Sequence, residues 1–374
     1  MSQRRIRVCL ISTEFPGMGP YGGFGVLTKD IALGVVSRGL DVTIAMPRKD
    51  GQHPVEIVDG LTVVSVPIST YVGLRSSMPF LGVYRMIDAD IYHSEEPSIG
   101  TALARMAMPG RKHLVTFQDP RDISDWRKEI APLKRGKLEE KLFWLRYYWQ
   151  TGWAARRADY KFTQAKFVGE KSKRIYGLSA IPDFLPNPLR IVQSRLPKEA
   201  RPTVCYLGRW DARKRPELLM EIIPQFPQVR FIFAGACLND TERDRQLRSQ
   251  CQGLPNVEMP GWVNAAQRAD ILDRSWIMIN TSTRECLPVS YLEAASYKCA
   301  ILAHENADSF PESFGFWARQ GTLNDYVAGL RYLLLGDRWK SLGELGSKYV
   351  KDTHEYDKVI DQHVQIYRRV LGKG

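Results

Sequence analysis

The strongest constraint on the fold is an alternation of short apolar runs with longer amphipathic stretches, which begins near the N-terminus and begins again near residue 202. Apolar runs of about four to eight residues between turn residues are typical of buried strands. The predicted strands are residues 5–12, 41–46, 61–67, 90–93 and 113–117, then 202–207, 229–234, 256–259, 276–280 and 300–303. The predicted helices include residues 26–38, 217–226, 266–273 and 288–296. Two series of strand–helix units predict an α/β chain with two doubly wound, Rossmann-like domains, each with a parallel sheet covered on both faces.

The boundary between the two domains is predicted in a proline-rich stretch. Five prolines lie between residues 182 and 202 with polar residues among them, which is typical of a linker. We therefore expect a first domain at residues 1–186, a linker at 187–201 and a second domain at 202–355. Residues 356–370 carry a helical pattern, and we expect this helix, within the C-terminal segment 356–374, to pack back on the first domain. With the two domains facing each other, ligands are expected at the carboxyl ends of the strands, in the cleft between them.

The composition narrows the class of protein. Of the 374 residues 44% are apolar, enough for two cores, and no apolar run approaches the roughly 18 residues of a membrane-spanning helix. The N-terminus shows no secretory signal, and the six cysteines form no C-x-x-C pair. We expect a cytoplasmic protein without disulfides or structural zinc. The net charge of +12 favours an anionic partner, and because no nucleic-acid motif accompanies it, we do not expect DNA or RNA.

Two glutamates, Glu285 and Glu293, flank a predicted helix start. Glu285 follows the apolar run 276–280 in a loop, and Glu293 is expected about two turns into a helix that begins at Pro288. The first N–H groups of a helix have no acceptors within the helix, so this position favours an anion. A ligand with phosphate and hydroxyl groups, such as a nucleotide sugar, suits the combination. A solvated helix face is the alternative.

A glycine-rich loop follows the first predicted strand. Residues 12–25 contain five glycines, which permit positive φ and a close approach of the backbone to a phosphate or a sugar. The loop is neither a P-loop nor a clean G-x-G-x-x-G motif. Its position before a helix favours contact with an anion, and a mobile turn is the alternative.

A cluster of cations follows the first strand of the second series. Arg209, Arg213, Lys214 and Arg215 lie within seven positions. Arg209 offers a rigid fork of donors and Lys214 offers a point charge, and together they suit a diphosphate. A solvated basic loop is the alternative.

Taken in order, these residues resemble the retaining glycosyltransferases with two Rossmann-like domains, the GT-B type of glycosyl transferase group 1 or family 4. Each matching element is weak alone, but the ordered set is specific and covers nearly the whole chain. The matching elements are the pair Gly22 and Gly23, residues 156–159 at a helix end, residues 186–188 before the linker, Gly208 and Arg209 with Lys214, and Glu285 with Glu293.

The resemblance implies that a sugar moves from a nucleotide-diphosphate sugar to a hydroxyl acceptor with retention of the anomeric configuration. The catalytic residues would be Glu285, Arg209 and Lys214. Arg209 and Lys214 would hold the departing diphosphate, and Glu285 would bind the hydroxyls of the donor sugar. Glu293 would bind the ribose. The acceptor would be a glycan, a lipid-linked molecule or a small molecule.

The same resemblance implies that backbone contacts complete the donor site without a metal or another cofactor. The N–H groups around Leu287, Pro288 and Val289 would hold phosphate at the helix start, and Gly22 and Gly23 would approach the donor from the first domain. Arginine and lysine take the place of a metal in such enzymes.

The chain departs from the family pattern on both sides. Cys286 and Leu287 stand where the family has glycine and phenylalanine, and Arg215 stands where glycine usually follows the lysine. In the first domain Gln118 replaces the usual histidine, and Asp119 follows it. Glutamine can donate a hydrogen bond but cannot carry a proton.

The acceptor side is therefore predicted from position alone, as His93, Gln118 and Asp119. His93 ends a predicted strand beside two glutamates, and a structural role is its alternative. His354 and His363 lie in the C-terminal part and are expected at the surface.

Residues 126–157 are rich in cations and aromatic side chains, which suits either an acidic membrane surface or a packed helix of the first domain. The first possibility would place the protein peripherally at the inner face of a membrane. Two other functions stay open, namely a catalytically inert homologue that binds a nucleotide sugar and a nucleotide-sugar epimerase on the same fold.

Overall fold

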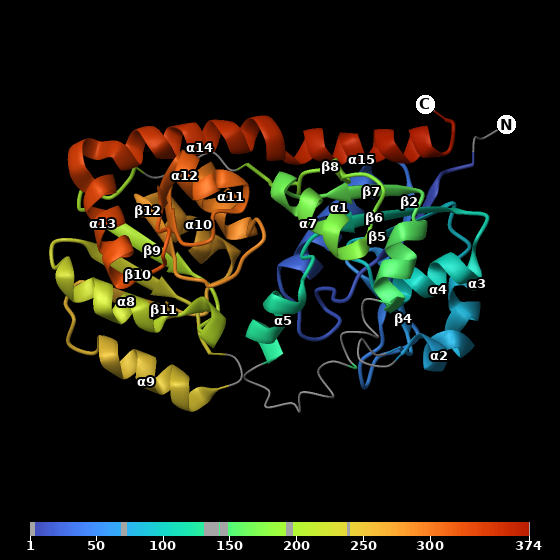
Figure 1. The fold of residues 1–374 in the computed structure, drawn as a ribbon, viewed down its shortest axis with the longest axis horizontal. Helices are drawn as coiled ribbons and strands as arrows, with labels where there is room; N and C mark the ends of the chain where they lie inside the picture. Colours follow the sequence, from blue (N-terminus) through green and yellow to red (C-terminus); the bar gives the residue numbers. More distant parts are fainter. Residues whose placement is uncertain are drawn as a thin grey trace. The chain divides into compact units, whose positions relative to one another are not determined.

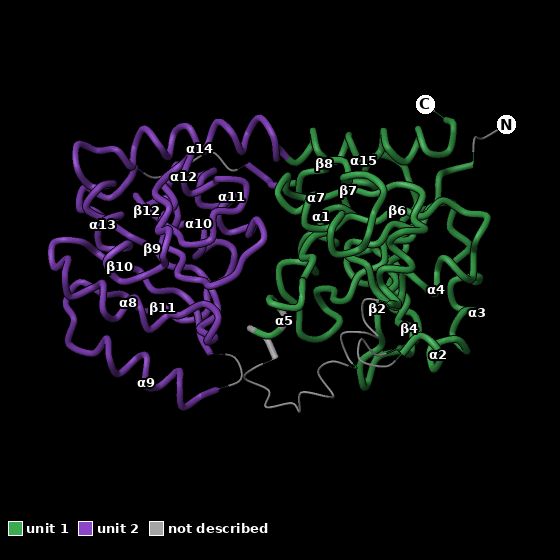
Figure 2. The backbone as a smooth tube through the Cα atoms, in the orientation of Figure 1, with its two compact units in different colours: residues 1–188, 356–374 green, residues 189–355 purple. Residues whose placement is uncertain are grey.

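The computed structural model describes residues 4–68, 73–130, 142, 149–191, 197–237 and 240–373. The chain forms two compact units, residues 1–188 with residues 356–374, and residues 189–355 (Figure 2). The middle of the predicted linker 187–201 and most of the basic aromatic segment 126–157 lie outside the described residues. No helix in the described part of the chain is both long enough and apolar enough to cross a bilayer.

The described residues of the first unit form an eight-stranded sheet in the order β3-β4-β2-β1-β5-β6-β7-β8 (Figure 1). Every pair of neighbouring strands is parallel except β3 and β4. The strands are β1 (Arg7–Ile11), β2 (Asp41–Pro47), β3 (Val55–Val58), β4 (Leu61–Val66), β5 (Ile91–Ser94), β6 (Lys112–Phe117), β7 (Tyr160–Thr163) and β8 (Asp183–Phe184). The helices are α1 (Gly23–Ser37), α2 (Leu74–Ser77), α3 (Leu81–Ile87), α4 (Ile99–Ala107), α5 (Ile123–Ile130), α7 (Lys166–Tyr176) and α15 (Tyr356–Val370), and residues 149–157 are also helical.

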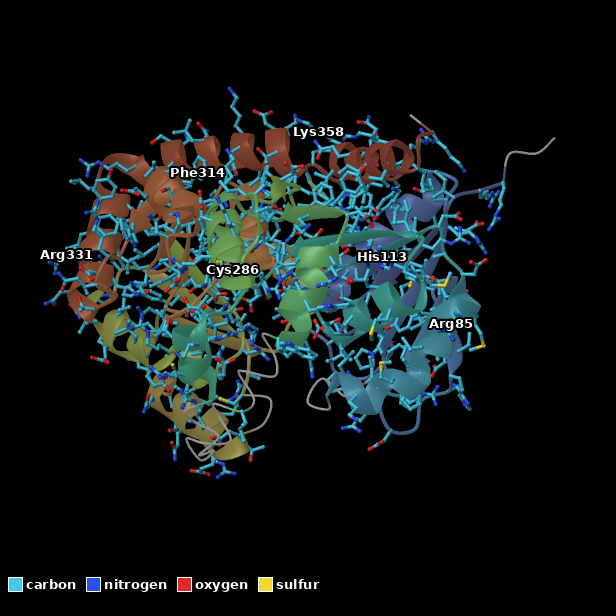
Figure 3. The ribbon with its side chains drawn as sticks, turned by 45° about the vertical axis from the view of Figure 1, so that its right-hand side comes forward. Arg85, His113, Cys286, Phe314, Arg331 and Lys358 are labelled. Carbon is cyan, nitrogen blue, oxygen red and sulfur yellow. The ribbon has the colours of Figure 1, made fainter. Side chains whose placement is uncertain are left out.

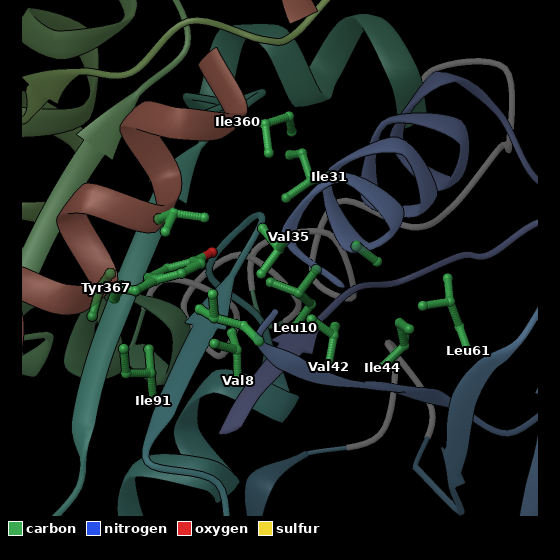
Figure 4. Packing of buried hydrophobic residues seen from close by; sticks show 14 of the residues in the cluster. Val8, Leu10, Ile31, Val35, Val42, Ile44, Leu61, Ile91, Ile360 and Tyr367 are labelled. Atoms are coloured by element: carbon green, nitrogen blue, oxygen red, sulfur yellow. The ribbon is translucent and has the colours of Figure 1, made fainter. Parts of the chain in front are cut away.

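Alternating side chains of this sheet enter two hydrophobic clusters, one on each face. Val8 and Leu10 of β1 pack in the cluster that includes residues of α1 and α15 (Figure 4). Cys9 and Ile11 pack in the cluster that includes residues of α3 and α4. This period of two is what a strand buried on both faces requires.

The C-terminal helix α15 packs against α1 of the same unit. Gly34 makes the close approach of the two helices possible, because a Cβ at this position would lie 2.7 Å from the side chain of Ile360. The Tyr356 hydroxyl donates to the Asp30 carbonyl over 2.9 Å, and Arg38 pairs with Asp361 over 2.6 Å.

Both histidines that were expected at the surface are buried, so that prediction was wrong. His354 is 0% and His363 is 3% exposed. His363 lies on the apolar face of α15 with Val359 and Tyr367, at the helical spacing that faces the sheet. Its Nδ1 lies 2.9 Å from the Val359 carbonyl, so part of the polar ring is satisfied by the helix itself.

The second unit has a six-stranded sheet in its described residues, all parallel, in the order β11-β10-β9-β12-β13-β14. The strands are β9 (Thr203–Leu207), β10 (Arg230–Ala234), β11 (Val257–Gly261), β12 (Ile277–Asn280), β13 (Ala300–Ala303) and β14 (Gly315–Trp317). The helices are α8 (Glu217–Ile222), α9 (Thr241–Cys251), α10 (Ala265–Arg274), α11 (Val289–Ser296), α12 (Phe310–Phe314), α13 (Leu323–Leu334) and α14 (Arg338–His354). The predicted fold class, two Rossmann-like α/β units, is confirmed.

Glycine shapes the carboxyl edge of the second sheet. Gly235 follows β10 with φ of 145°, and a Cβ there would lie 1.9 Å from the carbonyl oxygen of Gly208, which follows β9. The Gly235 N–H donates to the Gly261 carbonyl over 2.8 Å at the end of β11. Three neighbouring strand ends therefore lie close together at the edge where α/β sheets bind ligands.

Candidate active site

Lys214 and Glu285 meet at the carboxyl ends of the neighbouring strands β9 and β12. Lys214 ends a short 3₁₀ turn after β9, Ala212–Lys214. The Thr281 hydroxyl, just beyond β12, donates to the Lys214 carbonyl over 2.6 Å, which fixes the turn to the next strand end. From there the Lys214 ammonium donates a hydrogen bond to Glu285 Oε1.

The electrostatics of this pair favour the ionised form of Glu285. Burial works to raise the pKa of Glu285, but the charge and hydrogen bond of Lys214, with the charge of Arg213, outweigh it and hold the pKa below its usual range. The two side chains are 16% and 10% exposed. An ammonium has three N–H donors, so Lys214 can bind Glu285 and still donate to a ligand.

Arg209 lies on the same loop and is much more exposed. Its guanidinium is 3.5 Å from the Asp211 carboxylate, and its side chain is 53% exposed. An exposed ion pair of this kind contributes little to stability. The fork of Arg209 can therefore turn to an anion at the strand edge at small cost.

Helix α11 presents its N-terminus at the same edge. It begins at Val289, one residue later than predicted, with Pro288 as the N-cap and no side-chain cap. Pro288 has no N–H, so it cannot contribute the backbone donor that was predicted there. The first N–H groups of the helix, those of Val289 and Ser290, have no acceptors within the helix. The Leu287 side chain is buried, 3% exposed, and anchors the helix start.

Glu293 lies on the same helix but is paired with a residue that the sequence did not single out. It is the fifth residue of α11, nearer to the helix start than the two turns expected. Its carboxylate lies 3.0 Å from the guanidinium of Arg268 on α10. The two paired residues lie on different helices and are 25 positions apart in sequence, so no local spacing signals the pair.

The two departures from the family pattern in this unit differ in backbone conformation. Cys286, labelled in Figure 3, does not have a positive φ, so its backbone conformation does not require glycine. Arg215 adopts the left-handed conformation, with φ of 45° and ψ of 54°. This conformation costs an ordinary residue roughly 1–2 kcal/mol, which explains why glycine suits the position.

In the first unit the glycine loop is closed by its own carboxylate. Glu14 Oε1 accepts hydrogen bonds from the N–H groups of Gly22 and Gly25, both over 2.9 Å, at the start of α1. This role of Glu14 was not predicted from the sequence, although an acidic residue near a helix start is its usual signal. While Glu14 holds these donors, a phosphate cannot use them. At Gly23 a Cβ would meet nothing within 4 Å, so this part of the loop has open space beside it.

Gln118 and Asp119, the predicted acceptor side, are tied into a polar network. Glu96 Oε2 accepts from the backbone N–H groups of Gln118 and Asp119, over 2.7 and 2.8 Å. The Gln118 amide exchanges two hydrogen bonds with Asn187, over 3.0 and 3.1 Å, and contacts Glu95 over 3.4 Å. Gln118 is 3% exposed, so it holds the strand ends together.

The carboxyl groups of this network behave oppositely to Glu285. Burial raises the pKa of Glu95 to about 7, although a hydrogen bond from Gln118 works to lower it. Burial also raises the pKa of Glu96, although the backbone N–H groups of Asp119 and Gln118 work to lower it. Neither carboxyl has a direct ion pair among the described residues.

His93 lies in the core, not at an open strand end. It is 0% exposed, and its ring nitrogens lie 2.8 Å from the Tyr367 hydroxyl and 2.8 Å from the Thr116 hydroxyl. Burial lowers its pKa to about 3. The structural alternative therefore describes His93 better than the predicted acceptor role, because β5 turns this side chain toward α15.

Comparison with protein families decides the class. The model of the glycosyl transferase 4-like domain matches residues 22–188, and the model of glycosyl transferases group 1 matches residues 201–335. The chain belongs to the group 1 glycosyltransferases. Members of this family are retaining enzymes that transfer a sugar from a nucleotide-sugar donor, and the chain is such a glycosyltransferase.

Relatives and solved structures agree with this family. A subunit of phosphatidylinositol N-acetylglucosaminyltransferase from Arabidopsis thaliana is 32% identical over 104 residues, which span 27% of this glycosyltransferase and 23% of the relative. Sucrose-phosphate synthase from Thermosynechococcus elongatus aligns with a TM-score of 0.77 and 15% identity over 99% of this chain and 100% of the other. HepE of Anabaena in complex with UDP and glucose aligns with a TM-score of 0.69 and 13% identity over 97% and 99%. These structural likenesses show the GT-B fold.

Proposed function

We propose that this glycosyltransferase binds the diphosphate of its donor at the carboxyl edge of the second unit, with Arg209 and Lys214 as the cationic clamp. The observation that carries the proposal is the contact between Lys214 and Glu285 at the ends of β9 and β12. It joins a cation suited to phosphate with an ionised acceptor suited to sugar hydroxyls. The uncapped start of α11 adds backbone donors for a phosphate oxygen.

The roles in the reaction follow from these charges. The bond between the anomeric carbon and the diphosphate oxygen breaks, and the acceptor oxygen bonds to the same face of the sugar. The acceptor proton passes to the departing diphosphate. Arg209 and Lys214 stabilise the negative charge that develops on it, while Glu285 holds the sugar hydroxyls. Glu293 binds the ribose hydroxyls after it releases Arg268.

The acceptor is proposed to be a hydroxyl of a lipid-linked molecule. Support comes from the relative whose name includes phosphatidylinositol, and from the net charge of +12, which favours an anionic membrane surface. This choice is tested by measuring sugar transfer from the donor to three acceptors: dispersed phosphatidylinositol, a neutral lipid and a soluble sugar. Transfer to the soluble sugar alone would contradict it.

Thermal unfolding in the presence of UDP, GDP or ADP tests the clamp. A ligand at a hundredfold its Kd adds about 2.7 kcal/mol to the free energy of unfolding. We expect one nucleotide to stabilise the wild type and to lose most of this effect with Lys214→Ala. Lys340→Ala, an exposed lysine on α14, is the matched control and should keep the response. Equal stabilisation of the wild type and the Lys214→Ala variant by the nucleotide would contradict the clamp. In an activity assay, donor turnover without any acceptor would indicate an epimerase.

A further inference from the structure

Arg215 combines a left-handed backbone with a side chain that bridges two other segments. Its Nε donates to the Thr281 carbonyl over 2.7 Å, just after β12. Its Nη1 donates to the Gly321 carbonyl over 2.9 Å, in the turn before α13. The planar guanidinium thus fixes its own position against two carbonyl groups from different parts of the second unit, a geometry that a lysine cannot reproduce.

Thr281 also contacts the backbone of Lys214 and Arg215 through its side chain. The hydroxyl of Thr281, a fully buried residue, lies 2.6 Å from the Lys214 carbonyl and 3.0 Å from the Arg215 carbonyl. Gly321 has φ of 64°, and a Cβ there would lie 3.1 Å from Arg215 Nη2. The turn before α13 therefore accommodates the guanidinium closely.

We propose that Arg215 is a positioning residue for Lys214, and that its bridge to Thr281 and Gly321 holds the left-handed turn that directs Lys214 to Glu285. A left-handed conformation at a non-glycine residue persists only where the surroundings hold it. Here the guanidinium and the Thr281 hydroxyl supply that hold. The inference rests on the proposed function, because Lys214 is the residue that meets the diphosphate, and it goes beyond that function by assigning a role to Arg215.

The alternative role for Arg215 is direct contact with the nucleotide. The two roles differ in one measurable respect. A residue that acts through Lys214 loses its influence when Lys214 is removed, whereas a residue that contacts the ligand keeps it. A double-mutant cycle on nucleotide binding therefore separates the two.

The test uses the nucleoside diphosphate that the wild type binds best among UDP, GDP and ADP, with Kd measured by calorimetry well below the unfolding temperature. We expect Arg215→Lys to raise Kd about tenfold, because the charge stays and the bridge is lost. In the Lys214→Met background the same change should alter Kd less than twofold. Arg245→Lys, an exposed arginine on α9, is the control and should leave Kd unchanged.

Two further variants separate the effect of the Arg215 side-chain bridge on binding from the effect of the left-handed backbone conformation. Arg215→Gly removes the bridge but adopts the left-handed conformation freely, and Arg215→Ala removes the bridge and keeps the strain. We expect both to weaken binding, with the alanine variant also unfolding at a lower temperature. Wild-type affinity of the glycine variant would overturn the proposal, because the backbone alone would then suffice.

The remaining outcomes also test the positioning role of Arg215 and the proposed function. Equal losses from Arg215→Lys in the two backgrounds would overturn the positioning role in favour of direct contact. Wild-type binding with unchanged Kd in all Arg215 variants would overturn this inference and leave the proposed function standing. A wild type that binds none of the three nucleotides would overturn both. Circular dichroism of each variant shows that the measured protein is folded.

Discussion

Both units place glutamates at the carboxyl edge of a parallel sheet, but their surroundings drive the pKa values in opposite directions. In the second unit, Lys214 and Arg213 hold the pKa of Glu285 below its usual range despite burial. In the first unit, Glu95 has an amide neighbour instead of a cation, and burial raises its pKa to about 7. The same residue type at equivalent edges of two Rossmann-like units is therefore ionised in one and close to its titration point in the other.

This difference teaches what each edge can bind. Cations next to an ionised carboxylate suit a ligand with both phosphate and hydroxyl groups, as a nucleotide sugar has. An edge built from amides, backbone N–H groups and weakly ionised carboxyls carries little net charge and suits a neutral hydroxyl. Variants at each edge test whether the two edges differ in this way.

Lys214→Met should have the largest effect. It removes a cation from the departing diphosphate, and the loss of one such donor typically lowers the rate by about 10²–10³-fold. The pKa of Glu285 should also rise, because the largest interactions that oppose the effect of burial are then lost. The measurement is kcat/KM for nucleoside diphosphate release over a range of pH, with Lys340→Met as control. A loss below threefold would remove the contrast between the two edges.

Glu285→Gln should have the next largest effect. The amide keeps the shape but loses the charge that accepts hydrogen bonds from sugar hydroxyls, and a hydrogen bond to a charged group contributes about 1.5–3 kcal/mol, or roughly 10–100-fold. We expect transfer to fall by this factor while the Kd for the nucleoside diphosphate changes little. Unchanged transfer would mean that Glu285 does not meet the sugar.

Much of the fold could be predicted because hydrophobic periodicity reports it directly. The predicted strand 300–303 is β13, and the predicted helix 356–370 is α15, both with the observed bounds. The strands β3, β7, β8 and β14 were not predicted, since short strands such as β8, with two residues, leave too few positions to show a period. Helix ends were also less certain, as Pro288 shows.

The site could be predicted where neighbouring strand ends supply the residues, and not where the partner comes from elsewhere. The ends of β9 and β12 are adjacent in a doubly wound sheet, so Lys214 and Glu285 could be expected together. The pairing of Gln118 with Asn187, 69 residues away, depends on side-chain direction at the end of β6, which sequence does not reveal. His93 was predicted on the acceptor side for the same reason, because a position at a strand end does not reveal which face of the sheet a side chain occupies.

Glu95→Gln should alter the pH dependence of stability. The folded-state pKa of about 7 lies above the ordinary value, so the folded protein holds a proton that the unfolded chain has released, and the wild type loses stability as the pH rises from about 4.5 to 7. The variant lacks this loss. We expect it to be more stable than the wild type at pH 8, by up to about 3 kcal/mol, and to exceed the wild type by less than about 1 kcal/mol at pH 5.

Two buried histidines, His93 and His363, make the free energy of unfolding depend on pH with the opposite sign. Their contribution must be separated from that of Glu95. Burial lowers the pKa of His93 to about 3 and that of His363 to about 4, so their contribution is lost as the pH falls below about 6.5. Comparison of the variant with the wild type at each pH cancels it, since both proteins keep these histidines. Urea unfolding at pH 5, 6.5 and 8 is the measurement. Parallel stability curves for the two proteins would show that Glu95 is ionised throughout, as Glu285 is.

Arg268→Met should have the smallest effect, and it sharpens the comparison within the second unit itself. Arg268 is 43% exposed and lies 3.0 Å from Glu293, an arrangement that contributes roughly 0–1 kcal/mol to stability. If Glu293 binds the ribose, Arg268 competes with the ligand, and its removal should tighten nucleoside diphosphate binding by about twofold to threefold, which corresponds to well under 1 kcal/mol. A 2′-deoxynucleoside diphosphate lacks one of the competing hydroxyls and should gain less. Weaker binding of both nucleotides to Arg268→Met, measured by calorimetry, would instead make Arg268 a second cation that contacts the donor and would extend the positively charged edge from β9 to α10.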